Sequence, residues 1–152
     1  MATIDYPVGL PMPLRNGYDT NHVSPMMRTE MQTGRARQRR RYTSVPTMAS
    51  VSWIMTEKQA QLFEGFFRWT LVDGTEWFNL TLLTPMGLKP YEARFAEMYN
   101  GPTLTGRDLW TFTAELEIKD RQTIADGWPA SPEFVLGSDI IDKALNREWP
   151  AA

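Results

Sequence analysis

Trp110-Thr-Phe-Thr-Ala-Glu-Leu-Glu-Ile118 is the stretch that decides the fold of this chain. Apolar residues occupy its even positions, and threonine or glutamate occupies every odd position between them. Because side chains of a strand point to opposite faces with a period of two, this alternation predicts a half-buried strand. A strand with one buried and one wet face is typical of an antiparallel sheet.

A second strand and a helix precede this stretch. Thr47–Met55 alternates in the same way and starts after Pro46. Thr56 is a good N-cap, and Gln59 three residues later completes a capping box, which predicts a helix over residues 56–69. At 100° per residue its large apolar residues fall on one broad side, so we expect the helix to pack on the sheet. These residues are Leu62, Phe63, Phe66, Phe67 and Trp69.

Further strands complete the predicted body. We expect them over Thr75–Leu83 and Lys89–Tyr99, with turns at Asp73-Gly74, Pro85–Gly87 and Asn100–Pro102. The sequence therefore predicts a mainly β body over residues 28–121. We expect a β-sandwich or split-barrel-like antiparallel sheet with one amphipathic helix packed on it.

The N-terminal residues 1–27 differ in composition from this body. Four prolines favour an extended arm, since proline fixes its own backbone and restricts the residue before it. Apolar residues nevertheless recur at alternate positions from Ile4 to Leu14. We expect the arm to lie in a groove, either on its own domain or on a neighbour, and we predict Tyr6 and Leu10 as partner contacts.

Residues 122–152 form the other flank. Prolines frame a short helix predicted over Ser138–Arg147, whose apolar stripe includes Ile140 and Ile141. The segment is too apolar for a solvated linker and too short to fold alone. We therefore predict a docking tail whose partner contacts are Trp128, Ile140, Ile141 and Trp149.

A basic run lies between the arm and the second strand. Arg35, Arg37, Arg39 and Arg41 would share one face of a strand. This face is either simply solvated or meets an acidic surface on a neighbouring subunit, where arginine suits bidentate pairing with carboxylates. Contact with DNA is a third interpretation. It is disfavoured because a single short basic run, in a chain of net charge −2, makes only a weak phosphate-binding surface.

Composition and motifs give no support for catalysis. The 152 residues are 42% apolar and 22% charged, as in one modest globular domain, and there is no cysteine. The single histidine, His22, lies in the arm, and no nucleotide-binding motif is present. Glu115 and Glu117 could form a carboxylate pair, but alternating Thr and Glu is typical of a wet sheet face. We predict no catalytic, cofactor-binding or metal-binding residue, no cofactor, and no enzyme.

Targeting signals are also missing from the sequence. No apolar stretch approaches the length of a transmembrane helix, and the N-terminal residues lack the basic and apolar regions of a signal peptide. We expect no membrane partner and no specific nucleic-acid partner.

The order of these segments resembles the minor tail and distal tail proteins of long-tailed bacteriophages, the family of the phage lambda minor tail protein M. The resemblance covers roughly residues 28–121. It rests on Gly34–Tyr42, Val51-Ser-Trp53, the helix Thr56–Trp69 with Phe66-Phe67, Gly74–Leu83 with Trp77-Phe78, and Phe112–Glu117. The N-terminal arm and the C-terminal tail have no counterpart in the compact members of that family.

The resemblance implies a β-rich domain that forms homo-oligomeric rings at the tail tip and joins the tail tube to the hub or baseplate. The expected location is the virion, assembled in the host cytoplasm, with other tail or connector proteins as partners. The two flanks leave a head–tail connector or tail-completion adaptor as the alternative. A small module that binds peptide or carbohydrate on exposed Trp77, Tyr91 and Tyr99 is a further, weaker hypothesis.

Overall fold

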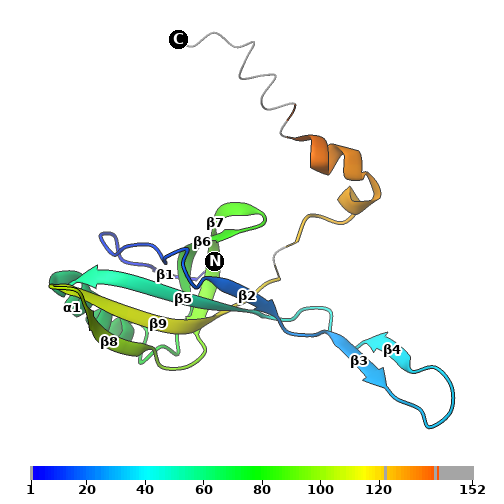
Figure 1. Ribbon diagram of the computed structural model, residues 1–152, viewed down its shortest axis with the longest axis horizontal. Coiled ribbons are helices and arrows are strands. Elements are labelled where there is room, and N and C mark those ends of the chain that lie inside the picture. The colour runs from blue at the N-terminus through cyan, green and yellow to red at the C-terminus, as the bar shows by residue number, and fades with distance from the viewer. Residues whose placement is uncertain (1, 122, 139, 141–152) are drawn as a thin grey trace. The chain divides into compact units, whose positions relative to one another are not determined.

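The computed structural model describes residues 2–121, 123–138 and 140, and the chain divides into two compact units, 1–122 and 123–152. The first unit is built on a seven-stranded sheet of order β1-β6-β7-β9-β5-β2, in which β8 pairs with β9, and it also holds the separate hairpin β3–β4 (Figure 1). The strands are β1 (Ile4–Asp5), β2 (Asp19–His22), β3 (Met26–Thr29), β4 (Arg37–Arg40), β5 (Thr47–Thr56), β6 (Phe78–Thr84), β7 (Gly87–Phe95), β8 (Asn100–Thr105) and β9 (Leu109–Ile118). The predicted mainly β fold with one main helix is confirmed.

The centre of the sheet is the antiparallel pair β5–β9. Its register runs without interruption from Thr47 opposite Ile118 to Thr56 opposite Leu109. Trp53, Phe112 and Leu116 are fully buried on one face of this pair, as the alternation predicts. The other face carries the threonines and glutamates, so each strand separates the core from the wet surface.

The helix covers the buried face and begins where predicted. It consists of α1 (Glu57–Gly65) followed by η1 (Phe66–Thr70), one turn of the wider π helix. The backbone N–H of Thr56 donates a hydrogen bond of 3.0 Å to Gln59 Oε1, which is one half of the predicted capping box. A side-chain N–H of Gln59 also donates to the carbonyl of Gly9, which ties the helix to the N-terminal segment.

The prediction that this helix packs its whole apolar side on the sheet is wrong for two residues. Phe63, Phe66 and Phe67 are buried, but Leu62 is 47% exposed and Trp69 is 75% exposed. At about 100° per residue the three phenylalanines already span about 100°, and both exposed residues lie on the flank beyond that stripe. The helix therefore buries a narrower stripe than the sequence suggested.

β8 begins at Asn100–Pro102, where the sequence predicted a turn. It pairs with the first half of β9, while β7 ends at Phe95 and pairs with the second half. Gly101 has a φ of +119°, and a Cβ built on it would lie 2.7 Å from the carbonyl oxygen of Thr111. The backbones approach so closely there that glycine is required, which explains why a strand contains a residue typical of turns.

The N-terminal segment belongs to the body and joins both edges of its sheet. β1 pairs in parallel with β6, which makes the sheet mixed and not purely antiparallel, and β2 pairs with β5 at the other edge (Figure 1). Between them, the N–H of Leu14 donates to the carbonyl of Ser52 over 2.8 Å. The sequence left open whether this segment lies on its own domain or on a neighbour. The structure places it on its own domain.

Tyr6 and Leu10 are part of the body's own packing. Leu10 is only 8% exposed, and the Tyr6 ring packs edge-on against Phe66 and stacks near Phe78. The Tyr6 hydroxyl donates to the carbonyl of Pro11, and burial raises the pKa of this phenol. Residues 1–27 are therefore not a separable arm, because Leu10 fills the core and the last two of them begin β3.

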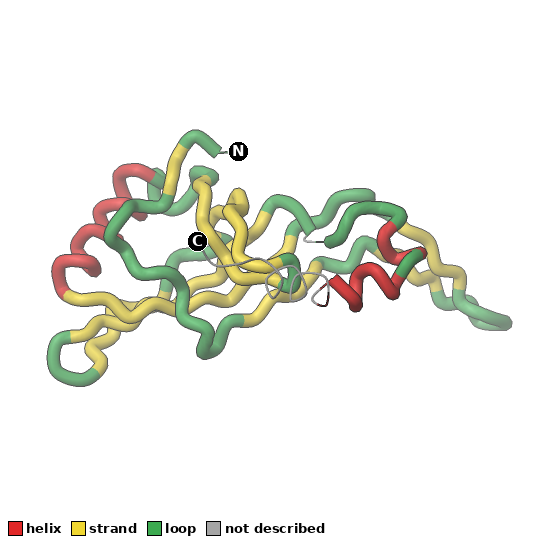
Figure 2. The backbone as a smooth tube through the Cα atoms, turned by 90° about the horizontal axis from the view of Figure 1, so that it is seen from above, coloured by secondary structure: helices red, strands yellow, loops and turns green. Residues whose placement is uncertain are grey.

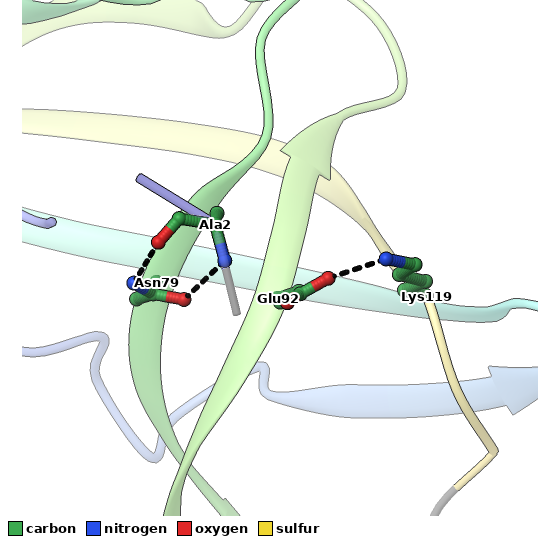
Figure 3. Close-up of polar contacts among 4 residues, drawn as sticks. All are labelled: Ala2, Asn79, Glu92 and Lys119. Atoms are coloured by element: carbon green, nitrogen blue, oxygen red, sulfur yellow. Dashed lines mark hydrogen bonds and ion pairs between the residues drawn. The ribbon is translucent and has the colours of Figure 1, made fainter. Parts of the chain in front are cut away.

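Polar contacts fasten the outer edge of the same region (Figure 3). The Asn79 side chain accepts a hydrogen bond of 3.1 Å from the Ala2 N–H and donates one of 2.8 Å to the Ala2 carbonyl. Nearby, Lys119 Nζ lies 2.7 Å from Glu92 Oε2. This contact lowers the pKa of the Glu92 carboxyl and raises the pKa of the Lys119 ammonium group.

The second unit contains the 3₁₀ turn η2 (Trp128–Ala130), and residues 132–138 are helical. The helix was predicted to begin at Ser138, but helical residues begin six positions earlier. Trp128 and Ile140 are 53% and 71% exposed. Ile141, Trp149 and most of the predicted helix lie outside the described residues. Within the described part, no helix is long and apolar enough to cross a membrane.

Candidate interaction surface

The β3–β4 hairpin is exposed along both of its strands. Met26 pairs with Arg40 at one end and Thr29 pairs with Arg37 at the other. Every residue of both strands is exposed, on both faces of the ribbon. Figures 1 and 2 show the hairpin as a ribbon of its own beyond β2, and no other described strand pairs with it.

The strand register determines which arginines lie on the same face of the hairpin. Arg37 and Arg39 lie on one face, where their cross-strand neighbours are Thr29 and Met27. Arg39 Nη2 lies 3.8 Å from the sulfur of Met27, which agrees with this assignment. Arg40 lies on the opposite face, directly across from Met26.

The two remaining arginines of the predicted set lie outside the strands. Arg35 precedes β4 and Arg41 follows it, and both are exposed. The guanidinium of Arg41 lies 5.2 Å from the centre of the Tyr42 ring, in a cation–π contact. The backbone N–H of Arg41 donates to the carbonyl of Pro25 over 2.8 Å, which closes the base of the hairpin.

Charge is strongly segregated between the hairpin and the rest of the chain. Residues 26–42 contain six arginines and one glutamate, which gives this segment a charge of +5. The remaining residues contain ten basic and 17 acidic side chains, which gives −7 and accounts for the net charge of −2. The near-neutral whole is therefore made of two oppositely charged parts.

The wet face of the main sheet carries part of the negative charge. Asp19 of β2, Ser50 of β5 and Glu115 of β9 are opposite one another in register, so their side chains lie in one row. Asp19 and Glu115 are exposed, and the described residues offer no ion pair to either. The next residues on the face are small and polar. We call Asp19, Ser50, Ser52, Thr113 and Glu115 the acidic sheet face.

Residues considered for catalysis are used in structural contacts. Glu117 Oε2 lies 2.7 Å from Arg94 Nε, so the carboxylate pair suggested by the sequence is joined to an arginine on one side. His22 Nδ1 shares a hydrogen bond of 2.8 Å with Thr47 Oγ1. In the part of the chain that the structure describes, no group of three or more His, Cys, Asp or Glu side chains could hold a metal ion.

The three aromatic residues suggested as a binding platform do not form one. Tyr99 packs edge-on against Phe63 and Phe67 in the core. Tyr91 shares a hydrogen bond of 2.8 Å with Thr84, and the Trp77 ring is covered by the guanidinium of Arg94 at 4.7 Å. Tyr99 thus packs in the core, the Tyr91 hydroxyl is bonded within the body, and the Trp77 ring stacks with a guanidinium.

One apolar cavity lies between the N-terminal segment and the β6–β7 hairpin. Its volume is about 420 Å³. The hydroxyl of Tyr18, one of the residues that line it, is buried and has no hydrogen-bond partner among the residues that the structure describes. The lining consists of Met12, Pro13, Leu14, Arg15, Tyr18, Thr81, Leu82, Leu83 and Leu88.

Comparisons with known proteins add no relative to this picture. No model of a protein family matches the chain, and no curated protein matches it.

The sequence did not predict that methionines share the hairpin with the arginines. A signal was present, since Gly34 separates two short stretches of strand length, which is the spacing of a hairpin with a longer loop.

Proposed function

We propose that this protein is a structural subunit of a bacteriophage virion, without enzymatic activity. It forms a ring at the tail tip or tail adaptor and joins the tail tube to the hub or baseplate. The observation that carries this proposal is the exposed β3–β4 hairpin on a well-packed body.

An isolated two-stranded hairpin has little stability in water, because neither of its faces is covered. Here both faces carry arginines, and Met26 and Met27 are exposed between them. Arginine and methionine are enriched where proteins contact one another. Such an element gains its stability from a partner, and a virion supplies permanent partners.

A ring is the assembly that this arrangement favours. A projecting element that binds a different surface on the next copy makes a head-to-tail contact, and such contacts close into rings when the rotation between copies allows it. The mainly β body with one helix also agrees with the fold that the resemblance to minor tail and distal tail proteins implies.

The alternative is a head–tail connector or tail-completion adaptor of the same virion. The exposed apolar residues of the second unit, Trp128 and Ile140 among them, favour a subunit that contacts more than one kind of neighbour. The module that binds peptide or carbohydrate has less support, because Trp77, Tyr91 and Tyr99 are engaged within the body.

The test is to assemble particles of the phage that encodes this chain with residues 27–40 replaced by a short Gly-Ser turn. We expect the variant to fold, because none of the core residues lies in that segment. We also expect it to be missing from purified particles, which should lack a complete tail by electron microscopy. Arg107→Glu, which changes an exposed arginine outside the hairpin, serves as the control and should assemble normally.

Mass spectrometry of purified wild-type particles decides the proposal directly. The chain should be present in a fixed number of copies per particle. Infectious particles that contain none of it would contradict the proposed function.

A further inference from the structure

We infer that the β3–β4 hairpin of one copy docks on the acidic sheet face of a second copy of this chain. The inference rests on the proposed function and names the two surfaces that would meet in the ring.

The hairpin supplies two arginines at a suitable spacing. Arg37 and Arg39 are two residues apart on one face of β4, so their Cα atoms are about 7 Å apart. On the body, Asp19 and Glu115 lie on the two strands that flank β5, at a separation of about 10 Å. Arginine side chains are long enough to bridge the difference, and their planar donors suit carboxylate partners.

The sheet face beside the two carboxylates carries short side chains. Ser50 lies between the carboxylates and Thr113 lies in the next row beside Glu115, and both are short and exposed, whereas the Ser52 hydroxyl opposite Thr113 donates to the carbonyl of Asn16. Ile54 is exposed further along the same face and offers an apolar contact for a methionine of the hairpin, such as Met27. The match thus includes charge and one apolar contact.

A second copy fits this hairpin better than nucleic acid does. DNA would meet the positive charge of the hairpin but would be repelled by the −7 on the rest of the chain. The exposed Met26, Met27 and Met31 would also gain nothing from phosphate groups. Against a second copy, both the arginines and the methionines find complementary groups.

The experiment is a charge exchange between two full-length variants. The first carries R37E and R39E in the hairpin, and the second carries D19R and E115R on the sheet face. We expect the wild-type protein to form oligomers in low salt and each variant alone to be monomeric, as measured by light scattering coupled to size exclusion.

Mixing the two variants should restore oligomers that contain both in equal amounts. Each hairpin then meets a face of opposite charge, because the native hairpin finds the native face and both altered surfaces find each other. R107E serves as a control, since it reverses one positive charge at an exposed site outside the hairpin, half the change made by R37E and R39E, and it should associate like the wild type.

Three results would overturn the inference. They are a wild-type protein that stays monomeric at low salt, a D19R/E115R variant that still associates, and a mixture that does not recover oligomers. Tight binding of a DNA duplex by the wild type, abolished by R37E/R39E, would replace the second copy with nucleic acid. None of these outcomes decides whether the chain is present in virions. That measurement tests the proposed function and is made separately.

Discussion

At the scale of single residues, the body is held by a cluster of aromatic side chains. Phe63 of the helix lies at its centre, with ring centroids 5.3 Å from Trp53 and 5.0 Å from Phe112. Phe67 and Phe95 meet edge-on at 4.9 Å near the end of the helix. Aromatic rings bury large areas and favour such tilted contacts, so the cluster fixes the helix on the sheet.

Gly74 is the residue where this packing leaves the least room. Its φ is +83°, and a Cβ added there would lie 2.7 Å from Phe67 Cε2 and 3.1 Å from Phe95 Cβ. Gly74→Ala should therefore combine left-handed backbone strain with a clash, and lower the free energy of unfolding by roughly 2–4 kcal/mol. Urea unfolding followed by tryptophan fluorescence measures this change.

Gly87→Ala is the matched control for Gly74→Ala. Gly87 has a similar φ of +89°, but nothing lies within 4 Å of an added Cβ. Its substitution should cost only the backbone term, roughly 1–2 kcal/mol. Equal losses at the two sites would show that the contact with Phe67 and Phe95 has no effect.

At the scale of elements, patterns with a local cause were predictable from the sequence. The strands β5 and β9 follow from strict alternation, and the start of α1 follows from Thr56 and Gln59. The exposure of Leu62 and Trp69 was not predictable, because the width of the buried stripe depends on how the helix lies on the sheet. β8 was missed because Gly101, which the close backbone approach requires, is also typical of turns.

The N-terminal segment and the interaction surface also depend on contacts that the local sequence does not reveal. The prolines of the N-terminal segment predict extended backbone, but nothing local reveals that β1 pairs with a strand more than 70 residues away. The arginine run was visible in the sequence, whereas the row of Asp19, Ser50 and Glu115 exists only once three distant strands pair. Local chemistry was predictable, and the juxtaposition of distant segments was not.

Deleting residues 2–22 should abolish cooperative folding of the body. The deletion removes Leu10 from the core together with the partly buried Ile4 and Tyr6, and it uncovers an edge of both β5 and β6. Each such side chain contributes roughly 1.5–3 kcal/mol, so the loss is comparable to the total stability of a small domain. Thermal unfolding followed by near-ultraviolet circular dichroism should show no transition.

A chain that ends at residue 121 is the control for this deletion. The buried core residues in the described part of the chain lie between Leu10 and Ile118, so this truncation removes none of them. It should unfold at the temperature of the full chain. A normal transition after deletion of residues 2–22 would contradict the role given to the N-terminal segment.

At the scale of the whole molecule, charge segregation matters more than net charge. A chain of net charge −2 would repel its copies only weakly, but a +5 segment and a −7 remainder attract when copies approach in the right orientation. The Debye length falls from about 30 Å at 0.01 M salt to about 10 Å at 0.1 M. Salt should therefore weaken the attraction between copies.

Static light scattering measures this attraction as the second virial coefficient. The coefficient should become more positive between about 0.01 M and about 0.1 M salt. A variant with R37Q, R39Q, R40Q and R41Q loses four positive charges, which takes its net charge from −2 to −6. Its copies should repel, so its coefficient should become less positive with salt. The same trend in both proteins would show that segregation does not govern their interaction.

The way the N-terminal segment joins both edges of the sheet also sets the order of folding. Its residues are synthesised before the strands they pair with, so β2 must wait for β5, and β1 must wait for β6. Contacts between residues far apart in sequence close large loops and form slowly. The helix and the β6–β7 hairpin can form early from local contacts, whereas β1 can pair only after β6 has been made. Until then the edges of β5 and β6 are open to other chains, which makes nascent copies most prone to mispairing before β1 closes the sheet.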